Sequence, residues 1–221
     1  MAQNNFDATG VLVLDQVTPV IRALFRAFNL DENYPGNGEV YIAKLSEDCD
    51  PSWGTWSEDV VDFANELGVS VVDTDNAVVH CLNALAAHFG TNVGDILEGQ
   101  DLDEDNDADL GTILAIARRF DDGHGLKAMT MEGAWYCSKP RLGEFGGFGE
   151  YCGRHFDLHI TSTEYRLGMG VEDALEQSNP ALAAERVAKH VERILAGIHD
   201  EATRVAVRKS LGEALVASAV N

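Results

Sequence analysis

The sequence predicts an α+β fold: a mostly helical acidic N-terminal part, then a β-hairpin or small antiparallel sheet, then a C-terminal helical hairpin. Apolar residues recur at helical spacing up to about residue 125. Between residues 126 and 163 they alternate as in strands, and helical spacing returns after residue 179. We expect parts 1–125 and 126–221 to form one compact unit with a soft boundary near residue 125, because 221 residues with 45% hydrophobic content can bury a real core.

The first part is expected to be rich in helices that begin and end at recognisable residues. Thr55 and Glu58 have the spacing of a capping box, which predicts the start of a helix. Asp73 or Thr74 is suited to cap the next helix, and Gly90 to end it. The expected elements are a helix over 17–29, a strand over 39–45, and helices over 55–67, 73–89 and 110–120.

In the second part, residues 126–137 and 150–163 alternate as two strands around a glycine-rich connection. This order predicts a long β-hairpin. The tail is expected to be helical, since Asn179 before Pro180 is a favourable N-cap and first-turn pair. Asp200 is suited to cap a last helix.

The terminal helices carry an apolar stripe that leaves two interpretations open. A helical hairpin usually packs on its own domain, whereas the same stripe on two chains would form a homodimer. The stripe consists of Ala184, Val187, Val191, Ile194 and Ile198 in the first helix, and Val207, Leu211 and Leu215 in the second.

The negative charge lies almost entirely in the first part. Residues 1–125 hold 24 acidic against 5 basic side chains, a net charge of −19, whereas residues 126–221 have a net charge of −2. Direct binding to nucleic acid or to anionic membranes is therefore not expected, because phosphates require clustered Lys and Arg. The expected partner is a basic protein surface, in particular that of a nucleic-acid-binding protein.

We expect a cytoplasmic protein. The first residues lack the basic and apolar regions of a secretory signal, and no apolar run approaches the length of a membrane span. The four cysteines are widely scattered, which is typical of reduced thiols rather than of a disulfide framework.

Three groups of carboxylates form the predicted partner surface. Glu58, Asp62 and Glu66 are four residues apart and so share a helix face, although like charges at this spacing destabilise a helix slightly. Trp53 and Trp56 lie between two groups and are candidate apolar anchors, with burial in the core as the competing interpretation. The predicted partner-binding residues are Glu47, Asp48, Asp50, Trp53, Trp56, Glu58, Asp59, Asp62, Glu66, Asp101, Asp103, Asp105 and Asp107.

The alternating aspartates from Asp101 to Asp109 resemble a calcium loop in composition but not in pattern. An EF-hand loop needs Gly at its sixth position and Glu at its twelfth. A loop that starts at Asp101 has Asn106 and Thr112 there, so an EF-hand is not expected. A solvated acidic loop ahead of a helix is the simpler interpretation, with Asp107 and Asp109 near the positive end of that helix.

These features predict a non-enzymatic acidic interaction protein, a nucleic-acid mimic that inhibits a DNA- or RNA-binding host protein. In general character it is similar to the anti-restriction and anti-CRISPR inhibitors of phages and mobile elements, on the basis of charge alone. Halophilic adaptation would acidify the whole chain, and the near-neutral second part argues against it. A structural or assembly protein of a virus or mobile element, held together by the terminal helices, is a further alternative.

Residues 151–161 suggest a different class of function. On a continuous strand, His155, Asp157 and His159 would share one face, where two imidazoles and a carboxylate are suited to bind a divalent metal. Cys152 would point to the opposite face, which argues against a zinc site shared with the histidines. The wet face of a half-exposed sheet is the simpler interpretation. No nucleophile or nucleotide-binding motif is present, so no cofactor is expected beyond this candidate metal.

Overall fold

The computed structural model describes residues 4–46, 49–71, 77–139 and 142–218. The chain divides into two compact units, residues 1–145 and 146–221. The described residues are mixed α and β, with six strands and eight α-helices. The boundary between the units lies after the composition change at residue 125, because the strand that follows this change belongs to the first unit.

The first unit contains antiparallel strands in the order β2-β3-β1-β4. Two of them, β1 and β2, are missing from the elements that the sequence predicts, so the expectation of a mostly helical N-terminal part is not confirmed. The strand expected over residues 39–45 is confirmed. The bounds are β1 Asn4–Val13, β2 Asp31–Gly36, β3 Glu39–Leu45 and β4 Ala128–Cys137.

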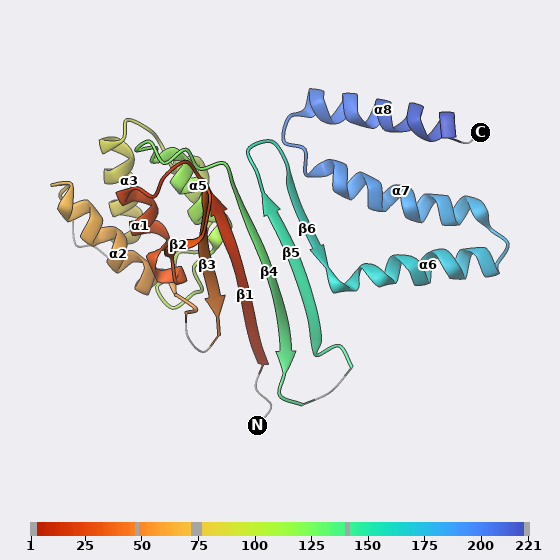
Figure 1. The fold of residues 1–221 in the computed structure, drawn as a ribbon, viewed down its shortest axis with the longest axis horizontal. Coiled ribbons are helices and arrows are strands. Elements are labelled where there is room, and N and C mark those ends of the chain that lie inside the picture. The colour runs from red at the N-terminus through yellow and green to blue at the C-terminus, as the bar shows by residue number, and fades with distance from the viewer. Residues whose placement is uncertain (1–3, 47–48, 72–76, 140–141, 219–221) are drawn as a thin grey trace. The chain divides into compact units, whose positions relative to one another are not determined.

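One face of these strands builds the core of the first unit. Leu12 on β1 lies opposite Val40 on β3 and Met129 on β4, and all three are buried. Gly10 allows β4 to approach closely, since a Cβ atom there would lie 1.8 Å from the carbonyl oxygen of Thr130. Four helices, α1 (Pro19–Phe25), α2 (Trp53–Glu66), α3 (Ala77–His88) and α5 (Leu110–Arg119), all lie on one side of the strands (Figure 1).

The helices of the first unit begin close to their expected positions. Ser52, rather than Thr55, caps α2, and its Oγ accepts from the backbone N–H of Thr55 at 3.3 Å. The expected caps Asp73 and Thr74 lie outside the described residues. The bounds are α1 Pro19–Phe25, continued by the 3-10 turn η1 Arg26–Phe28, α2 Trp53–Glu66, α3 Ala77–His88, α4 Gly94–Leu97 and α5 Leu110–Arg119.

The second unit starts with a hairpin of β5 (Phe145–Cys152) and β6 (Asp157–Thr161). The predicted single strand over residues 150–163 is therefore wrong, because Gly153 and Phe156 close a tight turn with a backbone hydrogen bond of 3.0 Å.

Three longer helices complete the second unit: α6 (Tyr165–Glu176), α7 (Pro180–Ala196) and α8 (Glu201–Ser218), preceded by the 3-10 turn η2 (Ser162–Glu164). The expected caps are present. Asn179 Oδ1 accepts from the backbone N–H of Leu182 at 3.1 Å, and Asp200 Oδ2 accepts from that of Thr203 at 2.6 Å. None of the described helices combines the length and the apolar character that crossing a membrane requires.

Replacing Trp56 with Phe tests the packing between α1 and α2. Trp56 is fully buried, and its indole N–H donates to the carbonyl oxygen of Leu24 at 2.8 Å. We expect the free energy of unfolding to fall by about 2–3 kcal/mol, because that carbonyl loses a partner and the smaller ring leaves a cavity. Urea unfolding followed by circular dichroism measures the loss.

Trp53→Phe is the matched control for this prediction. Trp53 is 2% exposed and contacts the ring of Trp56 edge-on, and the substitution removes the same volume. A smaller loss of stability is expected than for Trp56→Phe. Equal losses would show that volume alone accounts for the effect.

Candidate acidic interface

The acidic stretch, residues 101–109, lies against the start of α2. The backbone N–H of Trp53 donates to the carbonyl oxygen of Asn106 at 2.8 Å, and the N–H of Gly54 donates to that of Glu104 at 3.1 Å. The first N–H groups of a helix have no partner within it, so the stretch satisfies two of them with carbonyl oxygens. These bonds place a run of carboxylates beside a helix that is itself acidic.

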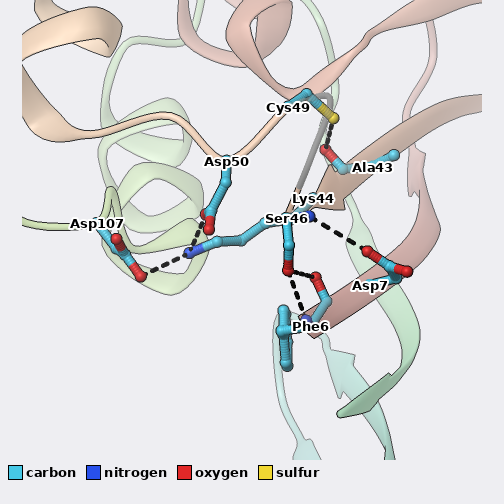
Figure 2. Close-up of polar contacts among 8 residues, drawn as sticks. All are labelled: Phe6, Asp7, Ala43, Lys44, Ser46, Cys49, Asp50 and Asp107. Atoms are coloured by element: carbon cyan, nitrogen blue, oxygen red, sulfur yellow. Dashed lines mark hydrogen bonds and ion pairs between the residues drawn. The ribbon is translucent and has the colours of Figure 1, made fainter. Parts of the chain in front are cut away.

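Lys44 on β3 joins two separate acidic segments (Figure 2). Its Nζ lies 3.0 Å from Asp50 Oδ1 and 3.5 Å from Asp107 Oδ2. The Lys44 side chain is only 16% exposed, so its charge is shielded from water more than that of an ordinary surface lysine. Asp50 and Asp107 are therefore partly neutralised, and their main role is to hold the loop after β3 and the acidic stretch together.

The loop after β3 is also held to β1 (Figure 2). Ser46 Oγ donates to the carbonyl oxygen of Phe6 at 2.6 Å, and the Ser46 N–H donates to Asp7 Oδ1 at 3.2 Å. The Cys49 thiol donates to the carbonyl oxygen of Ala43 at 3.3 Å. These contacts place Asp50 beside Lys44. The other two predicted residues of this group, Glu47 and Asp48, lie outside the described residues.

Hydrogen bonds within the acidic stretch give it a defined local structure. Asp109 caps α5, since its Oδ2 accepts from the N–H and hydroxyl of Thr112 at 2.7 and 2.8 Å. Asp103 Oδ1 accepts from the backbone N–H of Asp105 at 3.1 Å. The carboxylates of Asp101, Asp103, Asp105 and Asp107 are nevertheless exposed, and remain accessible to a partner.

Along α2, Glu58, Asp62 and Glu66 form an exposed line of carboxylates, which we call the acidic row. Gly54 is the preceding member of the same four-residue series, and a Cβ atom there would lie 3.2 Å from the Cβ of Glu104. The acidic row therefore begins where the acidic stretch contacts the helix. The fold brings the two predicted groups together into one surface.

A groove of about 520 Å³ borders the acidic row. Arg22 on one wall forms a two-point ion pair with Glu32, with distances of 2.6 and 2.7 Å. Arg26 is 78% exposed and lies 3.7 Å from Asp59. These two arginines, on α1 and η1, are not among the residues that the sequence predicts for the interface. The groove is lined by Pro19, Arg22, Ala23, Arg26, Leu30, Glu32, Asp59, Asp62, Phe63 and Glu66.

Asp59 carries a charge that the fold does not fully compensate. Partial burial raises the pKa of its carboxyl, and the carboxylates of Asp62 and Glu58 raise it further, while Arg26 acts in the opposite direction. The charged form of Asp59 is thus destabilised in the folded protein. Ionisation of Asp59 at neutral pH therefore opposes folding.

The prediction that Trp53 and Trp56 anchor a partner is wrong for this structure. They are 2% and 0% exposed, and their rings meet edge-on with centroids 5.2 Å apart. Both indoles belong to the core beneath α2, and Trp56 uses its only donor on Leu24. Because a contact anchor must reach the surface, the acidic interface lacks these apolar contacts.

The predicted metal ligands lie in the second unit and have other partners. Asp157 Oδ2 lies 2.8 Å from Nε2 of His199, and its Oδ1 accepts from the Gly153 N–H at 3.1 Å. The ring of His159 stacks on that of Phe148, and His155 is exposed in the turn before β6. Among the described residues, no group of three or more His, Cys, Asp or Glu side chains is arranged to hold a metal ion.

Two features of this region were beyond the sequence prediction. Cys152 lies directly opposite Asp157, so it shares the face of Asp157 and His159 instead of pointing away, because the turn breaks the strand alternation. His199 Nδ1 lies 3.1 Å from the carbonyl oxygen of Arg154. The histidine thus links the turn to the connection between α7 and α8, and no sequence motif predicts that contact.

His124, at the end of the first acidic part, is a structural residue. It is 2% exposed, and its Nδ1 accepts from the backbone N–H of Leu126 at 2.8 Å. The proton therefore resides on Nε2, which donates to the carbonyl oxygen of Ala117 at 3.0 Å. Both ring nitrogens are satisfied within the fold.

Comparison of the chain with protein-family models, with curated proteins and with solved structures returned no match.

Replacing Lys44 with Met tests whether this residue holds the acidic stretch in place. The variant keeps the aliphatic stem but leaves Asp50 and Asp107 without their shared cation. We expect a loss of about 1–2 kcal/mol in the free energy of unfolding and faster amide exchange in residues 101–107. Hydrogen exchange and urea unfolding at neutral pH measure these effects.

Lys127→Met provides the control, since Lys127 also pairs with an aspartate, Asp15 at 2.5 Å, but both side chains are more than half exposed. Its loss should stay below about 1 kcal/mol, as is typical of surface ion pairs. If the two variants lose the same stability, the position of Lys44 has no special importance.

Asp59→Asn should raise the free energy of unfolding at pH 7. A raised folded-state pKa means that the unfolded chain ionises Asp59 at a lower pH than the folded protein does, so folding becomes less favourable as pH rises through that range. The gain should shrink as pH falls and vanish below the ordinary pKa of 3.8, because the carboxyl is then protonated in both states.

Urea unfolding of both proteins across this pH range tests the prediction. Glu132→Gln, which removes an exposed carboxylate from β4, is the control and should change stability little. A less stable Asp59→Asn variant at pH 7 would contradict the assigned sign.

Proposed function

We propose that the protein is a non-enzymatic acidic interaction protein, a nucleic-acid mimic that occupies a basic, normally DNA- or RNA-binding surface of another protein. The observation that carries this proposal is the junction of the acidic stretch with the acidic row at Gly54 and Glu104. Two acidic segments, distant in sequence, thereby form one exposed surface.

The distribution of charge supports a protein partner with a basic surface. The first unit, residues 1–145, has a net charge of −18, and the second has a net charge of −3. A field of this size attracts a cationic surface and speeds its association, and it repels nucleic acid and anionic membranes. The groove beside the acidic row adds a recess in which a lysine or arginine of the partner would meet Asp62 and Glu66.

The spacing of carboxylates sets a limit on the mimicry. α2 has 14 residues and four carboxylates, which at a rise of about 1.5 Å per residue is one charge per roughly 5 Å. A DNA strand carries one phosphate per about 3.4 Å of its axis. The helix alone is thus less dense in charge than one strand, and the acidic stretch beside it supplies the additional carboxylates.

Reversing the acidic row tests the proposal. In the variant with Glu58→Lys, Asp62→Lys and Glu66→Lys, we expect affinity for the partner to fall by about 100-fold or more, because three attractive contacts become repulsive. The tagged protein is used to isolate the partner from a bacterial lysate. Affinity is then measured with the purified partner at low and raised salt, and with duplex DNA as competitor.

The matched control reverses three exposed carboxylates elsewhere in the first unit, with Glu39→Lys, Glu98→Lys and Glu132→Lys. This variant changes net charge by the same amount and should retain most of the affinity. If both variants bind alike, net charge and not the acidic row determines binding. A partner that is not displaced by DNA would overturn the mimicry.

The conservation of the fold in both variants is checked by circular dichroism and urea unfolding. The reversed side chains are exposed, and relieving the like charges near Asp59 should stabilise α2 slightly. Loss of binding with a stable fold is therefore expected to report on the surface.

A further inference from the structure

Helix α8 is the least supported helix of the second unit. It has 18 residues, and none of them is buried. By contrast, α6 and α7 bury Ala174, Ala183 and Leu195. Most helices in proteins owe their stability to tertiary packing of an apolar face, and α8 with no buried residue lacks that support within its unit.

The polar contacts that attach α8 to α7 lie near their connection. Arg208 forms a two-point ion pair with Glu192, with distances of 2.9 and 2.5 Å. Arg204 donates to the carbonyl oxygen of Ile198 at 3.4 Å. Beyond Arg208, Leu211 is half-buried and the other described residues of α8 are exposed. The C-terminal half of α8 thus has little support within the unit.

Apolar side chains remain exposed along both helices. On α8, Val207 and Leu215 are 40% and 61% exposed, and with Leu211 they follow a four-residue spacing that places them on one face. On α7, Val187 and Ile194 are 45% and 37% exposed. Contiguous exposed apolar surface is typical of interaction sites.

We propose that this stripe is the interface with a second copy of the chain, in which two α7–α8 hairpins form an antiparallel four-helix bundle. Charge favours a second copy over a different partner. Residues 180–218 carry five acidic and six basic side chains, a net charge of +1, so two such hairpins meet without repulsion. A basic partner is instead drawn to the first unit, whose net charge is −18.

The dimensions of the hairpin are sufficient for a stable dimer. A helix of 18 residues is about 27 Å long, and two helices side by side are about 20 Å wide. Their common face is therefore about 540 Å² in projection and larger in accessible area. Stable interfaces bury about 800 Å² per partner, which this face approaches.

The test is the mass of the full chain in solution. Sedimentation or light scattering should give twice the 23.9 kDa of one chain. The dimer should persist from about 0.1 M to about 1 M salt, over which the screening length falls from about 10 to about 3 Å, because the contact is apolar. The variant with Val207→Glu and Leu215→Glu should be a monomer with an unchanged circular dichroism spectrum.

The control variant has Val205→Glu and Val216→Glu, two exposed valines that are turned by about 120–140° around α8 from the middle of the stripe, at 3.6 residues per turn. It should remain a dimer. A chain that is monomeric at all concentrations, a dimer that survives the first pair of changes, or a dimer that both pairs abolish equally would overturn the proposal. A larger open assembly would also overturn it and would favour a structural protein.

A milder variant guards against loss of the helix itself. Val207→Ala with Leu215→Ala keeps good helix-forming residues and should weaken the dimer at least about tenfold without adding charge. Dilution series measured by sedimentation give the dissociation constant. An unchanged constant in this folded variant would overturn the assigned face.

Discussion

The acidic surface depends on one contact, the docking of the acidic stretch onto the start of α2. Segments of like charge normally repel one another and stay apart. Here the backbone hydrogen bonds of Trp53 and Gly54 satisfy donors that a helix start leaves unpaired, and Lys44 supplies one positive charge between Asp50 and Asp107. Because the bonds use backbone groups, they leave the carboxylates of the stretch free to face solvent. The main chain thus holds the acidic stretch in place, and its side chains supply the negative charge.

In this arrangement, a few residues account for the free energy that the acidic surface costs the fold. The raised pKa of Asp59 results from partial burial and from the carboxylates of Glu58 and Asp62, and Arg26 compensates for only part of it. The core beneath supports the surface, since Trp56 ties α2 to α1 through Leu24. A buried tryptophan therefore contributes to the interface by supporting it, not by touching a partner.

Short sequence patterns predicted much of the fold, but they could not predict contacts between residues that are distant in the chain. The strand over 39–45 and the caps at Asn179 and Asp200 follow from short patterns. β1 was not predicted because Gly10 interrupts its apolar alternation. Glycine is required at this position by the close approach of β4. For the site, the grouping of acidic residues was visible in the sequence. The roles of Lys44 and His199 were not, because each contacts residues far away in the chain.

The two proposals would divide the requirements of charge and association between the two units. A surface with a net charge of −18 resists contact with its own copy, so self-association needs a different part of the chain. The α7–α8 hairpin is close to neutral and carries exposed apolar side chains, which makes it suited to that role. A dimer joined there would carry two acidic surfaces, and a partner with two basic sites would then bind with increased avidity. Because the negative charge is concentrated in the first unit, the second unit could associate with its own copy while the first unit binds a basic partner.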